Sequence, residues 1–92
     1  MKTSSRFDLN SAPHWKVYTN FGSDIDLVAD GGGPCRRVRI NTGTAGTLAM
    51  ADAEGTAMDA IPNNNDGDVH DVIASKILAS GTVNITSITV YW

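Results

Sequence analysis

Cysteine is nearly absent from this 92-residue chain, where Cys35 is the only one. A lone cysteine cannot form a disulfide within the chain, and its scarcity predicts synthesis in a reducing cytosol. Long apolar runs are also missing. None approaches the roughly 20 residues that a membrane-spanning helix needs, so we expect no membrane partner. The N-terminal segment has one early lysine with no apolar stretch behind it, so we expect no signal peptide.

Charge is scarce as well. Asp, Glu, Lys and Arg make up 18% of the chain, against roughly a quarter in typical soluble proteins. Such a surface suits a protein packed against neighbours, and equally one that is simply solvated. The net charge is −3, and the only basic cluster is Arg36, Arg37 and Arg39. Nucleic-acid binding normally uses a broad basic footprint, so we expect no nucleic-acid partner.

The three arginines are nevertheless the candidate partner-contact residues. They fit an acidic partner surface or a phosphate. The alternative interpretation is that Arg36, Arg37 and Arg39 form the solvated side of a strand, in which Val38 and Ile40 point inward.

Apolar residues make up 41% of the chain, enough for one core in one domain. Seven short segments alternate apolar and polar residues at spacings of about 8–12 residues, separated by Gly-, Asn- and Asp-rich turns. They are residues 15–21, 25–29, 35–42, 47–51, 56–61, 69–80 and 83–92. The pattern predicts an all-β fold, a small antiparallel β-sandwich of jelly-roll type with about seven short strands. Residues 1–14 are expected to form an N-terminal arm, and residues 15–92 the sandwich.

Residues 69–80 fit either a helix or a strand. Their apolar residues fit a helical stripe, but their Val and Ile content favours the strand.

In the final segment, residues 83–92, the side chains of Ile88, Val90 and Trp92 share one face, which predicts that the chain's end is held in the core. Val83 and Ile85 are in the opposite phase, so a bulge is expected near Thr86 and Ser87.

No residue pattern predicts catalysis, a metal or a cofactor. The loop segment 62–71 is rich in Asn and Asp, but Pro62 stands where an EF-hand would begin with a carboxylate. Cys35 and the histidines His14 and His70 lack a recognisable catalytic spacing. The sequence 31–34, GGGP, is not followed by the Lys and Ser or Thr of a phosphate-binding loop. We therefore expect a protein that is not an enzyme.

The second half of the chain resembles a known family. The segment RVRINTGTAGTLAMADAEGTAMDAI and the ending KILASGTVNITSITVYW are similar to the small spike-base and head-decoration proteins of tailed phages and gene transfer agents. The residues that carry the resemblance are Gly46, Thr47, Leu48, Gly55, Thr56, Ile77, Ala79, Ser80, Gly81, Thr82, Ile88 and Trp92. The loop 62–68 is longer than its counterpart in the family, and the arm has no match there.

The resemblance implies a β-sandwich virion component without enzyme activity. Such a protein forms homo-oligomers and attaches to capsid or spike proteins, after synthesis in the host bacterium's cytoplasm. It also implies a strand at residues 69–80. The alternative function is a small carbohydrate- or receptor-binding β-sandwich, in which the aromatic side chains of Trp15, Tyr18 and Tyr91 stack on sugar rings.

Overall fold

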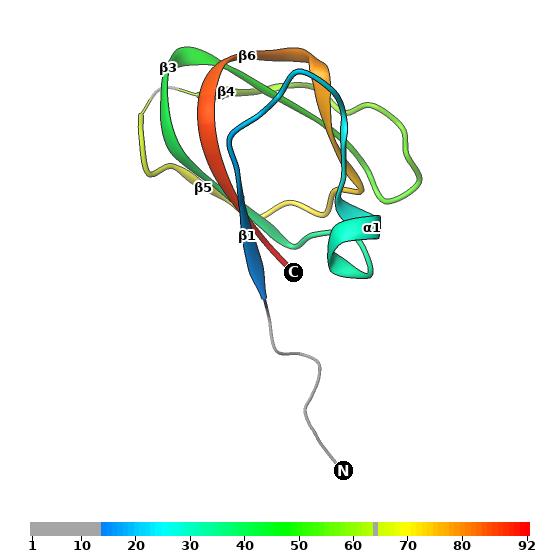
Figure 1. Cartoon of the computed structure of the whole chain (residues 1–92). Coiled ribbons are helices and arrows are strands. Elements are labelled where there is room, and N and C mark those ends of the chain that lie inside the picture. The colour runs from blue at the N-terminus through cyan, green and yellow to red at the C-terminus, as the bar shows by residue number, and fades with distance from the viewer. Residues whose placement is uncertain (1–13, 64) are drawn as a thin grey trace.

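Two long strands form the centre of the fold, which is known from a computed structural model that describes residues 14–63 and 65–92 (Figure 1). Strand β3 (Arg37–Ala51) pairs antiparallel with β6 (Lys76–Tyr91). The short strands β1 (Trp15–Tyr18) and β2 (Ile25–Asp26) both pair with β6, at opposite ends of it. Strands β4 (Ile61–Asn63) and β5 (Val69–His70) pair with β3 in the same way. One short helix, α1 (Leu27–Gly31), completes the described elements.

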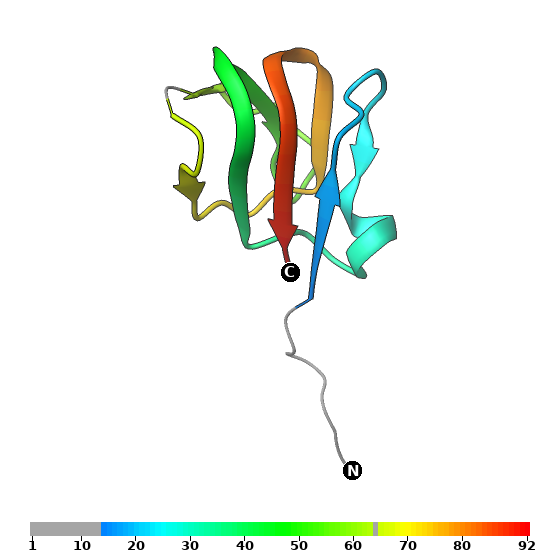
Figure 2. The same cartoon turned by 60° about the vertical axis from the view of Figure 1, so that its left-hand side comes forward.

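The six strands belong to one antiparallel sheet that is bent into two layers (Figure 2). The first layer contains β1, the C-terminal half of β6, the N-terminal half of β3 and β5. The second layer contains β2, the N-terminal half of β6, the C-terminal half of β3 and β4. This assignment follows from the pairing register, because β1 pairs with the end of β6 and β2 with its beginning. The sandwich therefore arises from the folding over of one two-stranded ribbon.

Bulges on both long strands produce the bend. Residues 44–46 of β3 oppose Asn84 alone, and residues 79–82 of β6 oppose Leu48 alone. Unequal numbers of residues on paired strands bend the ribbon and increase its twist. Asn84 has a φ of 60°, a left-handed conformation that Asn tolerates better than most residues. Its side-chain amide donates to the Ala45 carbonyl at 3.0 Å, which ties the bulged residues of β3 to Asn84 of β6.

Small and hydroxyl-bearing side chains hold the bend in place. Gly46 lies directly against the Val83 carbonyl, and a Cβ there would overlap the carbonyl oxygen. The Thr47 hydroxyl donates to the Gly81 carbonyl at 2.6 Å. The Thr82 hydroxyl donates to the Leu78 carbonyl at 2.7 Å and accepts from the Ala49 amide at 3.1 Å. These side chains satisfy backbone groups that the bulges remove from the regular ladder.

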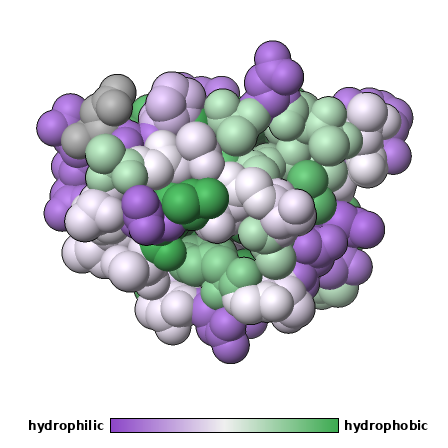
Figure 3. All heavy atoms as spheres, turned by 90° about the horizontal axis from the view of Figure 1, so that it is seen from above, coloured by the Kyte–Doolittle hydropathy of each residue, from purple (hydrophilic) through white to green (hydrophobic). Residues whose placement is uncertain are grey.

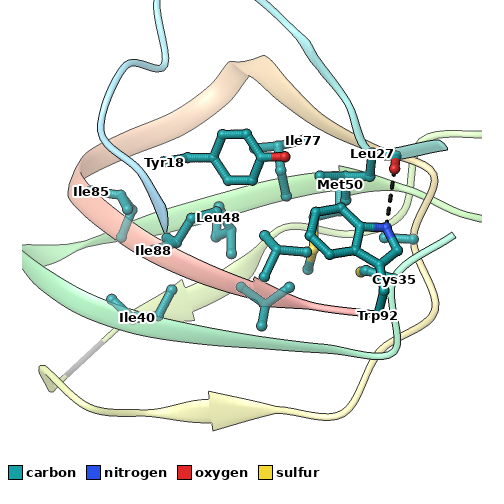
Figure 4. Packing of buried hydrophobic residues seen from close by; sticks show 13 residues of the cluster. Tyr18, Leu27, Cys35, Ile40, Leu48, Met50, Ile77, Ile85, Ile88 and Trp92 are labelled. Atoms are coloured by element: carbon teal, nitrogen blue, oxygen red, sulfur yellow. Dashed lines mark hydrogen bonds between the residues drawn. The ribbon is translucent and has the colours of Figure 1, made fainter. Parts of the chain in front are cut away.

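The core lies between the two layers (Figure 4). The first layer contributes Val38, Ile40, Ile88 and Val90, and the second contributes Leu48, Met50 and Ile77, all with at most 2% of their surface exposed. Tyr18 enters from β1, and Leu27 enters from α1. Because β-strands alternate their side chains, the neighbours of these residues on the first layer point outward.

Trp92 closes the open end of the sandwich. Its indole N–H lies 3.1 Å from the Leu27 carbonyl and 2.9 Å from the Gly33 carbonyl, and its ring packs directly on Gly31, where a Cβ has no room. Its backbone N–H donates to the His14 carbonyl at 2.9 Å, and the His14 ring stacks on the indole. The burial of a large aromatic side chain contributes about 2–3 kcal/mol. Trp92 thus links β1, α1 and the loop that leads into β3.

The all-β antiparallel sandwich expected from the sequence is confirmed. So are the inward positions of Ile88, Val90 and Trp92, and those of Val38 and Ile40. The bulge expected near Thr86 and Ser87 is present as a register shift, since Ser87 and Ile85 pair with the consecutive residues Thr42 and Gly43. Strands occur at both ends of the ambiguous segment 69–80, as β5 and the start of β6, with irregular chain between them.

The prediction of a strand at residues 25–29 is wrong beyond Asp26, where helix α1 begins. The Asp26 carboxylate accepts from the Val28 and Ala29 amides, an N-cap that starts helix α1. Gly32, with a φ of 80°, ends the helix and donates its N–H to the Val28 carbonyl. Capping at both ends outweighs the short alternation of the sequence here.

Other strand boundaries also differ from the expectation. The turns expected at residues 43–46 and 80–82 are bulges inside β3 and β6, so two long strands replace several short ones. In the segment 56–61, which alternation predicts to be a strand with Met58 and Ala60 inward, Met58 packs against the core but Ala60 is exposed. β4 includes Pro62, which lies in a segment expected to be loop. An edge strand accommodates proline because no further strand needs its missing N–H.

The bent end of the molecule has a weakly polar surface. Seen from above, apolar side chains gather in a shallow hollow there, and the strongly polar residues lie around it (Figure 3). Within the described residues, no helix is long and apolar enough to cross a membrane.

A polar contact fixes α1 against β1. The Tyr18 hydroxyl donates to the Asp30 carboxylate at 2.6 Å, and Lys16 lies 3.5 Å from the same oxygen. Burial and this hydrogen bond raise the pKa of Tyr18 well above its usual range. The hydrogen bond from Tyr18, aided by the charge of Lys16, lowers the pKa of Asp30. This ionised carboxylate therefore stabilises the fold at neutral pH.

Replacement of Gly46 by Ala tests the bend. We expect Gly46→Ala to lower the free energy of unfolding by about 1–3 kcal/mol, because the new Cβ pushes on the Val83 carbonyl. Urea-induced unfolding measures this change. Gly33→Ala is the matched control, since a Cβ at Gly33 meets nothing within 4 Å. Equal unfolding midpoints for Gly46→Ala and the parent would show that the close approach at Gly46 is not needed.

Acid unfolding tests the Tyr18–Asp30 contact. Because the folded-state pKa of Asp30 lies below its ordinary value of 3.8, its contribution is present above that pH and is lost as the pH falls through the folded pKa. Tyr18→Phe is expected to melt at a lower temperature than the parent at neutral pH. The difference should narrow below pH 3.8. Thermal melts across this range measure it, and a difference that stays constant with pH contradicts the contact.

Candidate partner-binding site

The most distinctive surface is the outward-facing side of the first layer, which we call the outer face. It consists of Trp15, Val17, Arg37, Arg39, Val69, Thr89 and Tyr91. The pairing register places these residues in two rows across the sheet. One row runs Val17, Thr89, Arg39, Val69, and the other runs Trp15, Tyr91, Arg37.

Apolar side chains are unusually exposed at the two edges of the outer face. Trp15 is 65% exposed, and Val17 and Val69 are each 51% exposed. The sequence places Trp15 and Val17 on one face of a strand, and in the structure that face points away from the core. Tyr18 takes the inward position instead and is buried. Tyr18 therefore cannot contribute to a sugar-stacking surface with Trp15 and Tyr91.

The arginines occupy the middle and one end of the outer face. The Arg37 Nε donates to the Asp71 carboxylate at 2.6 Å, which raises the pKa of the guanidinium. Arg39 donates to the Asn41 side-chain carbonyl at 3.1 Å. Arg36 precedes the strand, and its Nη2 donates to the Trp92 carbonyl at 3.1 Å. The structure thus brings all three candidate residues to one side of the molecule, each held by one contact.

A pocket opens beside this row of residues, at the end of the sandwich that Trp92 closes. It has a volume of about 350 Å³ and is lined by Arg36, Arg37, Tyr91 and Trp92. Two arginines, each already bonded to an oxygen atom, and two aromatic residues therefore line one cavity. A wall of this kind favours an anion that is planar or is attached to an apolar group.

The cysteine and the two histidines, residue types that carry catalytic chemistry in many proteins, each make separate contacts in this structure. Cys35 is fully buried, its thiol faces the Val72 carbonyl at 3.6 Å, and burial raises the pKa of the thiol. A thiol in that environment is held in its unreactive form. His14 stacks on Trp92, and His70 pairs with Val38 in the sheet.

The acidic residues of segment 62–71 also make separate contacts, each with a different partner. Asp66 accepts from the Gly43 amide at 3.0 Å, Asp68 accepts from the Asn65 amide at 3.3 Å, and Asp71 binds Arg37. Asn64 lies outside the described residues. Across 14–63 and 65–92, no group of three or more His, Cys, Asp and Glu side chains is placed to hold a metal ion.

Sequence reasoning missed two contributors to this site. Asp71 binds Arg37 although 34 positions separate them, and only the pairing of β5 with β3 brings them together. His14, the last residue of the predicted arm, stacks on Trp92, and residues 1–13 of that arm lie outside the described residues. No local signal in the sequence marks either contact.

Comparison with known protein families, with curated proteins and with solved structures found no match to this chain.

The exposed residues of the outer face are expected to contribute little to stability. Replacement of Trp15 and Val17 together by Thr, a good strand former, should change the free energy of unfolding by less than about 1 kcal/mol, the scale of a cross-strand pair. Ile88→Ala, in the core of the same layer, should cost about 2–5 kcal/mol. Urea-induced unfolding measures both. A large loss in the Thr variant would mean that the outer face supports the fold.

Proposed function

We propose that this chain is a non-enzymatic structural component of a tailed-phage or phage-like particle, a capsid spike base or decoration protein. In this proposal it acts by homo-oligomerisation and by attachment to other virion proteins through the outer face. The observation that carries the proposal of a binding surface is the exposure of Trp15 and Val17 beside Tyr91, Arg37 and Arg39.

The composition of the outer face supports protein binding. Trp, Tyr and Arg are the residues most enriched where protein interfaces derive their affinity. A sheet surface is flat and rigid, so little conformational entropy is lost when a partner covers it. Trp15 and Tyr91 are also direct neighbours across the β1–β6 pairing, so they present one continuous aromatic area.

The phage-like context rests on the sequence resemblance. The residues that carry the resemblance include Gly46 and residues 79–82, which lie in the two bulges of the bend, and Thr47, which lies between these bulges and bonds to Gly81. These residues build the shape of the sandwich rather than the outer face. The sequence motifs shared with that family thus lie in the framework of the sandwich, and the outer face is a separate surface of this chain.

Sedimentation velocity over a range of concentrations tests this function. The parent chain is expected to sediment as a discrete oligomer, which electron microscopy would show as a ring. The variant with Trp15 and Val17 replaced by Thr is expected to sediment as a monomer while it keeps its fold. A parent chain that stays monomeric at high concentration, and that does not bind phage-like particles, would contradict the proposal.

The second candidate function is a carbohydrate-binding or receptor-binding module. The exposed Trp15 ring beside Tyr91 favours it, since sugars stack on such side chains. Tyr18 does not contribute, because it is buried. Binding to a glycan array that disappears in Trp15→Thr would favour this candidate over the structural one.

A further inference from the structure

We propose that the pocket lined by Arg36, Arg37, Tyr91 and Trp92 binds a carboxylate side chain from an acidic segment of a partner protein. This inference names the chemistry of the contact and rests on the proposed function of the outer face, since Arg37 and Tyr91 belong to both. The pocket is thereby the point at which the partner is recognised, and the apolar residues around it supply contact area.

Both guanidinium groups already have a bonding partner in the structure. Arg36 is fixed by its bond to the Trp92 carbonyl, and Arg37 by its bond to Asp71. Each of these bonds engages one nitrogen, and a guanidinium has five N–H donors. Both side chains therefore keep donors for a ligand. Because they are ordered in advance, a ligand loses less binding energy to the ordering of side chains.

A carboxylate is planar and accepts two parallel N–H bonds from one guanidinium, the strongest arrangement that arginine makes with an anion. Of the two aromatic residues that line the pocket, Trp92 is only 8% exposed, so Tyr91 supplies most of the apolar wall. Such a wall suits the methylene groups of a Glu or Asp side chain better than it suits a hydrated ion. Trp15 continues this apolar wall on the other side of Tyr91, which extends the contact to a surface of protein size.

The chain is acidic overall, with a net charge of −3, and Asp71 lies beside Arg37. A nucleic-acid backbone or a phosphate dianion would be repelled by these negative charges, and only a small basic patch would offset the repulsion. Two copies that meet outer face to outer face would bring Arg37 and Arg39 against their own counterparts, whereas a ring joins each outer face to a different surface of the next molecule. A singly charged carboxylate meets less repulsion from Asp71 than a dianion does.

A peptide titration followed by nuclear magnetic resonance tests the inference. The probe is a capped triglutamate peptide added to the ¹⁵N-labelled full chain, with a capped triglutamine peptide as the neutral control. We expect the triglutamate alone to shift the side-chain Nε resonances of Arg36 and Arg37 and the indole resonance of Trp92. A dissociation constant of about 1 mM is the expected scale for a single such contact.

Variants locate the contact. Arg36→Gln and Arg37→Gln are each expected to weaken triglutamate binding by about tenfold or more, the usual effect of the loss of a charged hydrogen-bond partner. Lys76→Gln is the matched control, because it removes the same charge from the second layer and should change the binding less than about twofold. Amide-resonance dispersion verifies that each variant is folded.

Several results would overturn the inference. They are the absence of shifts with triglutamate, equal shifts with triglutamine, equal weakening by Lys76→Gln, or equally tight binding of inorganic phosphate at the same resonances. The proposed function can be contradicted independently of the carboxylate site. Oligomers without triglutamate binding would remove only the carboxylate site, whereas triglutamate binding by a chain that never assembles would remove only the assembly role.

Discussion

The pairing of β3 with β6 is the constraint on which the rest of the structure depends. Each short strand pairs with one of these two, so neither layer exists without the ribbon. The ribbon encloses a core only because opposed bulges fold it over near Asn84 and Gly46. A straight ribbon would leave one side of Ile40, Leu48 and Ile88 in water. The bend thus converts a hairpin-like pairing into a sandwich, and side-chain hydroxyls at the bulges replace the backbone bonds that the bend removes.

Much of the fold could be predicted from the sequence because alternation reports burial directly. Val38, Ile40, Ile88 and Val90 follow that alternation, and all four are fully buried. The bend could not be predicted as such, because Gly, Ser and Thr at residues 43–46 and 80–82 have the composition of turns. The helix after Asp26 was missed because its signals, an N-cap and a glycine C-cap, span only a few residues. Whether such a segment forms a turn, a bulge or a helix depends on its contacts with distant parts of the chain, and local composition does not reveal those contacts.

The candidate site was predictable only in part. The three arginines were identified from their clustering, and the structure brings them to one side of the molecule. The pocket depends on Trp92 and Tyr91, which meet Arg36 and Arg37 through pairing over more than 50 residues of sequence. The orientation of β1 is equally non-local: Tyr18 points into the core and bonds to Asp30, so Trp15 and Val17 point outward. The residues that build the fold and those that face a partner are therefore largely separate sets.

The contact between His14 and Trp92 has a practical consequence. The carbonyl of His14 lies 2.9 Å from the amide of Trp92, so the described part of the chain begins and ends at the same corner, next to the arginine pocket. An affinity tag or fluorescent reporter joined directly after Trp92 would crowd that cavity. The same proximity makes residues 14–92 a suitable template for circular permutation: a short linker joins Trp92 to His14, and new termini open in the exposed turn at Glu54 and Gly55. Such a permuted chain would carry its label on the opposite layer.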